Sequence, residues 1–517
     1  MDCKVISEIA GRKVWQLWFG LACATTVVTL ATLRISPPIW QDEVQIVDYG
    51  RTAIQGSDRS WSINWSSEGR PMLILSYLAC GLQELACCLT GNTEVGPRLA
   101  SVVGALFAGT CALGWLLQRG CVPIAALGGA VLLLVDPVFA QSYRGARVDC
   151  WVFGFIFLTC WLIQRSTVDS RREKRVNLLL ILAGVPFALA GLCWPSAILL
   201  VPLVLSELMV AYQLRLTWNS FVGFIPGLVT LGAATTMALL LFLAPVWSSV
   251  WSAVMDLSGS VSNVSKTESI LSSGYAIAAS YRLSPWLLVL GIGGFFVQPN
   301  RLLGIAFLLA ALGVSLTTVY IHRALYLLPY LLLSVVCLIA LLAQAQRLLS
   351  IALKAGLLAL ACLVCWSSAV TLGARTWTAW SQRLARSPDR ILEVGKAAIG
   401  ARDVSVYTHC WEFYYAGRQL GWRQFRLFSL PEDQDSEVLS RLLSKMDFVI
   451  LREGDPANRQ IQHSMQQVGF TLSRRIQAGS QAGEDNRVSR SRLGASGFGE
   501  YLIYAPTHTP SVSDEQR

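Results

Sequence analysis

Long runs of apolar residues fill most of the first 374 positions, without the alternation of a half-buried strand or the polar face of a soluble helix. A helix needs about 20 apolar residues to cross a membrane core roughly 30 Å thick, so each run predicts a membrane span. Eleven runs reach or approach this length, at 14–33, 98–117, 122–141, 146–164, 177–193, 195–213, 221–246, 285–298, 301–320, 324–343 and 350–372. The pattern predicts an α-helical multi-pass membrane protein.

The composition agrees with this pattern. Hydrophobic residues make up 54% of the chain and charged residues 14%, and the mean hydropathy is +0.50, whereas an ordinary soluble domain carries roughly 25% charged residues. These values exclude a soluble globular enzyme and a disordered chain. The 14 cysteines have no regular spacing, so we expect no disulfide framework. In a membrane protein the net charge of +10 reflects topology, and no nucleic-acid partner is expected.

The orientation of the chain follows from its basic residues. No small-residue cleavage site precedes Arg34, which favours a retained first span over a signal peptide. If the ambiguous apolar stretch 71–89 crossed the membrane, the basic block at 171–175 would face outward, against the positive-inside bias. We therefore expect 71–89 to lie along the outer interface, with the N-terminus in the cytoplasm. Five polar segments then share the extracytoplasmic face of the plasma membrane: 34–70, 143–149, 247–284, 322–323 and all residues after 375.

Beyond residue 374 the pattern changes to short alternating segments. The change divides the chain into a membrane domain, 1–374, and an extracytoplasmic domain, 375–517. After a helix-like connector at 375–398, we predict a helix at 435–445 and strands at 404–407, 425–428, 448–452 and 501–504. Strands that alternate with helices favour a small parallel α/β domain. The basic, Gly- and Ser-rich stretch 478–499 is expected to be a mobile loop, and the residues from 507 to be disordered.

Two motifs place carboxylates at the outer face. Asp42 and Glu43 follow the prolines that end the first span, and they open an amphipathic stretch. On their own they are better explained as solvated residues of a first helical turn, stabilised by the helix dipole. Asp149 lies where the third predicted span turns into the fourth, two residues after Arg147. On its own this motif is equally a charged turn in which the two residues balance each other.

Three further arginines lie at the same face. Arg98 opens the second predicted span, Arg323 precedes the tenth, and Arg70 stands at the start of the stretch 71–89. Each of them alone can be an interfacial side chain that reaches toward water. Charged side chains that persist at membrane depth are costly, however, and are therefore functional candidates.

Together these motifs resemble the GT-C glycosyltransferases, especially the group of protein mannosyltransferases and aminoarabinose transferases. The resemblance covers roughly residues 14–345 and depends on the order of the motifs along the chain. These are Asp-Glu in the first outer loop, Arg-Pro before an interfacial helix, Pro-Arg-Leu at the second span, Arg-x-Asp before the fourth and a late Arg-x-x-Tyr-x-Leu-Pro. The resemblance implies a GT-C-like membrane domain followed by an outward-facing α/β domain.

The resemblance also implies a chemistry. The donor is a sugar on a polyprenyl phosphate, and transfer inverts the anomeric carbon. Asp42 is then the general base, and Glu43 and Asp149 position the acceptor or the sugar. Arginines suit the phosphate because a guanidinium binds its oxygens in pairs and stays charged; the candidates are Arg98, Arg147, Arg323 and Arg70. No cofactor is required, since a single phosphate needs no Asp-x-Asp motif to hold a metal, although two carboxylates can bind a divalent ion.

The sequence departs from the family pattern at two places. The segment Gly69-Arg70-Pro71-Met72 lacks the family's second proline. The segment 192–195 lacks the lysine that is usual near the outer end of the fifth span, and Arg282 or Lys266 can supply that cation instead.

Two other functional classes remain open at this stage. A transporter places ionisable groups near the middle of the membrane, whereas the predicted spans carry few, with Asp136 and Glu207 as exceptions. A non-catalytic scaffold would bind its partner through the α/β domain. For the enzyme, the expected partners are a polyprenyl-phosphate-linked sugar, membrane lipids, and an acceptor that is a lipid, a glycan or a protein.

Overall fold

The structure is a computed structural model that describes residues 3–55, 75–168, 173–212, 218–262, 270–282, 284–296, 301–315, 321–344, 351–400, 403–425, 436–455, 458–478 and 498–507. Contacts divide the chain into two units. The first comprises Met1–Thr29, Met72–Ala79 and Ser101–Ala374. The second comprises Leu30–Pro71, Cys80–Ala100 and Arg375–Arg517, so it joins three separate stretches of sequence.

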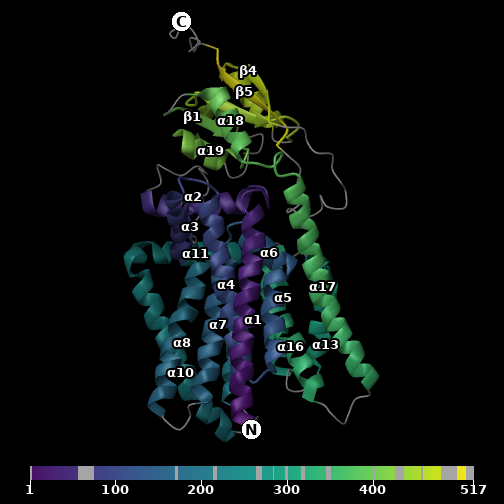
Figure 1. The fold of residues 1–517 in the computed structure, drawn as a ribbon. Helices are drawn as coiled ribbons and strands as arrows, with labels where there is room; N and C mark the ends of the chain where they lie inside the picture. The colour runs from purple at the N-terminus through teal and green to yellow at the C-terminus, as the bar shows by residue number, and fades with distance from the viewer. Residues whose placement is uncertain are drawn as a thin grey trace. The chain divides into compact units, whose positions relative to one another are not determined.

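The first unit is helical. Every apolar run predicted as a span contains a helix where the structure describes it. These helices are α1 (Cys3–Thr32), α4 (Val95–Gln118), α5 (Pro123–Val135), α6 (Pro137–Arg144), α7 (Asp149–Val168), α8 (Glu173–Cys193), η4 (Pro195–Leu200), α9 (Val201–Ala211), α10 (Trp218–Leu243), η5 (Ala244–Val246), α11 (Trp247–Ser262), α12 (Ile270–Ser280), α13 (Pro285–Phe295), α14 (Arg301–Ser315), α15 (Ile321–Ala324), η6 (Leu325–Leu327), α16 (Leu328–Gln344) and α17 (Ile351–Ser381). Helices α7, α8 and α10 pack side by side (Figure 1).

Three helices within the described ranges are long and apolar enough to cross a membrane: Arg12–Thr32, Val95–Gln118 and Phe224–Met255. The bent pair α5 and α6 makes a fourth if it counts as one span, and several other apolar helices are shorter. The prediction of eleven spans therefore stays a prediction.

The run 122–141, predicted as one continuous span, is broken in the structure. Helices α5 and α6 meet at an angle of 56°. Pro137 lacks a backbone N–H and starts the second helix, while the Asp136 carboxylate accepts hydrogen bonds from the amides of Val138 and Phe139, both at 3.0 Å. Asp136 is thus a helix cap, and Ser284 also donates to it at 3.0 Å.

The second unit contains a five-stranded sheet made of β1 (Ser405–Thr408), β2 (Arg423–Phe425), β3 (Phe448–Arg452), β4 (Phe470–Gln477) and β5 (Glu500–Pro506). The strand order is β2-β1-β3-β5-β4, with β2, β1 and β3 parallel to one another. Strand β5 runs antiparallel to both β3 and β4. The prediction of a parallel sheet was therefore correct for β2, β1 and β3 but wrong for the two strand pairs that involve β5.

The missed part of the sheet has a physical explanation. Strand β4 lies at an edge and exposes most of its side chains, so it lacks the apolar alternation that marks a strand in the sequence. Helix α21 (Asn458–Gln467), which precedes it, was not predicted either. The expected mobile loop, the expected disordered tail and part of the predicted strand 425–428 lie outside the described residues.

Helices cover both faces of this sheet (Figure 1). Alternation along β1 sends Val406 to one face and Tyr407 to the other. The first face packs against α18 (Asp389–Ile399) and α19 (Phe413–Leu420), and the second against α20 (Ser436–Leu443) and α21.

Two helices from the N-terminal part of the chain complete the second unit, α2 (Gln41–Gln55) and α3 (Tyr77–Leu89). Helix α3 has 13 residues, fewer than the roughly 20 that a span needs. Residues of α2, α3 and α19 form one buried apolar cluster, which includes Val44, Val47, Cys87, Tyr414 and Tyr415.

Gly50 permits the close packing of α2 on α3. A Cβ atom at this position would lie 2.0 Å from the carbonyl oxygen of Cys80. Gly50→Ala is therefore expected to lower the free energy of unfolding by about 1–3 kcal/mol. The matched control is Gly81→Ala, whose Cβ would meet only Ile54 at 3.9 Å and whose higher helix propensity favours the fold. Thermal unfolding in detergent measures both, and equal stability of the two variants would contradict the predicted close contact.

Candidate active site

The first group of predicted site residues lies at the start of α2, in the second unit. Asp42 and Glu43 occupy the first turn of this helix, where the dipole stabilises negative charge. Successive residues of a helix point in different directions, and the two carboxylates therefore differ in environment: Asp42 is half-buried, whereas Glu43 has 0% exposure. Of the pair, Asp42 is the carboxylate that an outside molecule can reach.

Glu43 is paired with Arg98 inside the protein. The guanidinium donates to both carboxylate oxygens, from Nε at 2.9 Å and from Nη2 at 2.8 Å. Its third nitrogen, Nη1, donates to the carbonyl of Leu33 at 2.6 Å. The Arg98 side chain is 0% exposed. Binding a donor phosphate would require these bonds to break, so the geometry favours a role for Arg98 in holding the first turn of α2.

A tyrosine from the C-terminal part of the chain also reaches this pair. The Tyr415 hydroxyl donates to Glu43 Oε1 at 3.3 Å. Burial raises the pKa of the Glu43 carboxyl, and the charge and hydrogen bonds of Arg98 oppose this rise. Nothing in the sequence around Tyr415 indicated this contact.

The second group lies in the first unit, in the turn between α6 and α7. Gly145 ends α6, and Ala146 adopts a φ of 54°, a left-handed value that non-glycine residues rarely take. This turn brings Arg147 back toward Asp149, the first residue of α7. Arg147 Nε donates to Asp149 Oδ2 at 2.6 Å, and both side chains are buried. The two residues therefore do balance each other, as the alternative interpretation of this motif supposes.

Asp149 has two further donors. Ser142 donates to Oδ2 at 2.9 Å, and Tyr326 donates to Oδ1 at 2.8 Å. Tyr326 belongs to η6, directly after the helix α15 that carries the half-buried Arg323, and α15 packs against α6. The late Arg-x-x-Tyr motif is thereby joined to the Arg-x-Asp motif. Its spacing was a signal for Tyr326 in the sequence, whereas nothing marked Ser142.

The predicted site residues thus form two groups, one in each unit. Asp42, Glu43 and Arg98 belong to the second unit, and Arg147, Asp149 and Arg323 belong to the first. Their convergence on one site stays a prediction. Arg70 lies outside the described residues.

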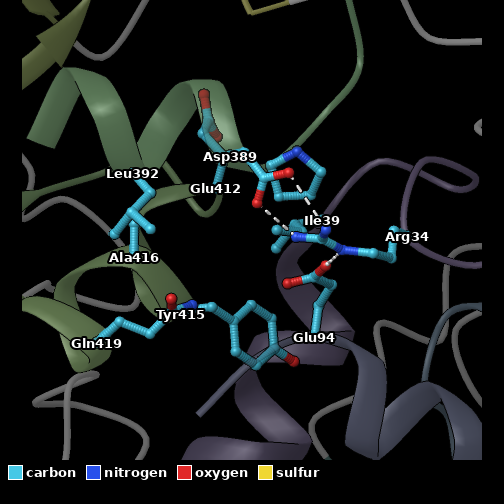
Figure 2. Close-up of a pocket in the computed structure, with 10 residues that line it drawn as sticks. Arg34, Ile39, Glu94, Asp389, Leu392, Glu412, Tyr415, Ala416 and Gln419 are labelled. Atoms are coloured by element: carbon cyan, nitrogen blue, oxygen red, sulfur yellow. Dashed lines mark hydrogen bonds and ion pairs between the residues drawn. The ribbon is translucent and has the colours of Figure 1, made fainter. Parts of the chain in front are cut away.

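A small open pocket lies beside Tyr415 in the second unit. Figure 2 shows Arg34 reaching between two carboxylates at its edge. Arg34 donates to Glu94 at 2.8 Å and to Asp389 at 2.7 Å, and the hydrogen bond from Arg34 lowers the pKa of Asp389. The remaining lining residues are Ile39, Pro388, Leu392, Glu412, Ala416 and Gln419.

Among the described residues, no group of three or more His, Cys, Asp or Glu side chains is arranged to hold a metal ion.

No protein-family model matches the sequence, and a search of the curated proteins found no match. The fold does match solved structures. One is ArnT from Cupriavidus metallidurans in the apo state, with a TM-score of 0.56 and 11% identity over 95% of this chain and 98% of that chain. A second structure of ArnT, bound to undecaprenyl phosphate, matches with a TM-score of 0.56 and 11% identity over 94% of this chain and 97% of that chain.

This chain has a GT-C fold. The arabinofuranosyltransferase AftD from Mycobacteria shares the GT-C fold with a TM-score of 0.53 and 14% identity, over 95% of this chain and 40% of that chain. The fold implied by the order of the sequence motifs is therefore confirmed. The match to the apo ArnT structure extends over 95% of this chain.

Proposed function

We propose that this protein is an integral-membrane inverting glycosyltransferase, which moves a sugar from a polyprenyl-phosphate donor to an acceptor at the extracytoplasmic face of the plasma membrane. The observation that carries the proposal is the end-to-end match of the GT-C fold to ArnT, which has also been seen with undecaprenyl phosphate bound. The two buried carboxylate–arginine groups give additional support, because charged groups are retained in an apolar protein where they serve a function.

In the proposed reaction an acceptor oxygen attacks the anomeric carbon on the face opposite the phosphate. The bond between the anomeric carbon and the phosphate oxygen breaks, and the phosphate leaves with the electron pair. Asp42 takes the proton of the acceptor, a role that suits a half-buried carboxylate in the first turn of α2. Inversion follows from this single displacement.

The charged groups around Asp149 have a different role in the proposal. Asp149 is held by three donors and orients the sugar or the acceptor. Arg147 and Arg323 stabilise the negative charge that develops on the leaving phosphate. Arg70 is a further candidate for this role, whereas the enclosed Arg98 serves to hold α2.

The direct test is donor consumption. Purified protein in lipid nanodiscs is incubated with a panel of radiolabelled polyprenyl-phosphate sugars and an extract of membrane acceptors. We expect label to leave the lipid for at least one donor. In sealed vesicles, label that crosses the membrane while still attached to its lipid indicates a transporter instead. A panel in which every donor keeps its label contradicts the proposal.

The proposed orientation predicts which loops are accessible from outside. In cells, an impermeant thiol reagent should modify Asp58→Cys but not Asp169→Cys, each introduced into a background without the native cysteines. Labelling of position 169 from outside would reverse the orientation.

Tyr326→Phe tests the role of Asp149. The variant removes one of its three hydrogen-bond donors, and we expect kcat to fall about tenfold, the effect of one hydrogen bond to a charged group. Tyr281→Phe is the matched control: its hydroxyl is similarly buried and donates at 2.8 Å to the carbonyl of Ala324, not to Asp149. Transfer kinetics separate the two, and an equal loss of activity in both variants would point to a purely structural role for Tyr326.

A further inference from the structure

Helix α19 of the C-terminal part connects to both N-terminal helices of the second unit. Tyr415 donates to Glu43 on α2 at 3.3 Å. Three residues further along, Arg418 donates to both oxygens of Glu84 on α3, at 2.7 Å each, and to Asn92 at 2.8 Å. Polar contacts to two helices from one short helix define its rotation as well as its position.

These contacts are buried. Tyr415 is 1% exposed and Glu43 is 0% exposed, and the side chains of Arg418 and Glu84 are 4% and 1% exposed. A buried charge without its partner is strongly unfavourable, so such pairs are kept in one arrangement. The surrounding cluster, which includes Val44 and Val47 of α2, excludes water from the same interface.

The opposite side of α19 is anchored in the sheet. Phe413 packs edge-on against Tyr501 of β5, with ring centroids 4.9 Å apart. The helix ends at Gly421, which has a φ of 76° and is suited to this left-handed cap. The chain then turns directly into β2, so α19 has little freedom to move without the sheet.

We propose that Tyr415 is a positioning residue of the transfer reaction and that α19, through it, makes the C-terminal domain a part of the catalytic machinery. This inference rests on the proposed function. Tyr415 donates a hydrogen bond to the carboxylate of Glu43, the residue next to Asp42. Together with the hydrogen bond that Arg98 donates to the same carboxylate, it determines how the first turn of α2 is held. Tyr415 does not take part in proton transfer itself. It sets the direction in which Asp42 is presented to the acceptor.

The chain supplies a matched control for this role. Tyr414 is the neighbouring tyrosine, is equally buried, and donates at 3.4 Å to Asp48, six residues after Asp42 on α2. Tyr414→Phe and Tyr415→Phe therefore each remove one hydroxyl from the same interface. Only the second removes a bond to the first turn of α2.

The experiment compares both variants with the wild-type full-length protein in nanodiscs. The readouts are release of radiolabelled sugar from undecaprenyl phosphate and hydrogen exchange of the α2 amides. For Tyr415→Phe we expect kcat to fall about tenfold with an unchanged KM for the donor, and exchange at the start of α2 to rise. For Tyr414→Phe we expect kcat within twofold of the wild type. In an Asp42→Asn background, Tyr415→Phe should cause no further loss.

Three outcomes would overturn the inference. A wild-type kcat in Tyr415→Phe, or an equal fall in Tyr414→Phe, excludes the positioning role and leaves the proposed function intact. A wild-type protein that leaves the label on every polyprenyl phosphate in the donor panel overturns the proposed function, and this role with it.

Discussion

Asp42→Asn is expected to lower the rate of sugar transfer by about 10²–10⁴-fold, the contribution that a positioned general base makes. The amide cannot accept the proton of the acceptor, although its size and its place in the first turn of α2 are unchanged. Because Asp42 is only half-buried, the variant should express and unfold like the wild type. The measurement is transfer from a radiolabelled polyprenyl-phosphate sugar under saturating donor.

The control for this variant is Glu437→Gln, which neutralises an exposed carboxylate in the first turn of α20. Its activity should match the wild type. Full activity in Asp42→Asn would remove Asp42 as the base and would leave the enzyme hypothesis without its central group.

Arg98→Met is expected to destabilise the protein by about 3–5 kcal/mol, because it leaves the buried Glu43 carboxylate without its partner. In the variant the pKa of Glu43 rises further, so folding takes up a proton and stability should fall as pH increases. Thermal unfolding in detergent at two pH values measures both effects.

Two comparisons separate the buried pair from ordinary surface charge. The double variant Glu43→Leu with Arg98→Met should recover most of the lost stability, since it removes both charges together. Arg475→Met breaks an exposed ion pair with Glu453, and its cost should be below about 1 kcal/mol. If Arg98→Met costs no more than Arg475→Met while transfer activity is lost, Arg98 would bind the donor after all.

The helical part of the fold was predictable because each apolar run is long and nearly uninterrupted, and such runs fold as helices in a membrane. The break at Asp136 could have been inferred from the proline that follows it, but its angle depends on the neighbouring helices. In the second unit, β1 and β3 were found because their buried residues alternate or cluster. Strand β4 was not found, because an exposed edge needs no apolar residues.

The candidate site was predictable in part. Asp42, Glu43 and Asp149 are conspicuous because carboxylates are rare in this part of the chain. The sequence could not distinguish Asp42 from Glu43, because the two differ only in the direction that the helix gives them. It could not show either that the Arg98 guanidinium donates to Glu43 and to the carbonyl of Leu33.

From the sequence alone came the membrane class, the positions of the helices within the apolar runs, the change of pattern at residue 374 and the order of motifs that indicated a GT-C glycosyltransferase. Those features are local, since hydrophobicity, proline and charge act over a few neighbouring residues. Only the tertiary structure shows which charged side chains form ion pairs with one another. It also shows that residues 30–71 and 80–100 form one unit with the C-terminal sheet. Pairings such as Glu43 with Tyr415 join residues 372 positions apart, and burial, which no local pattern encodes, determines what each charged group can do.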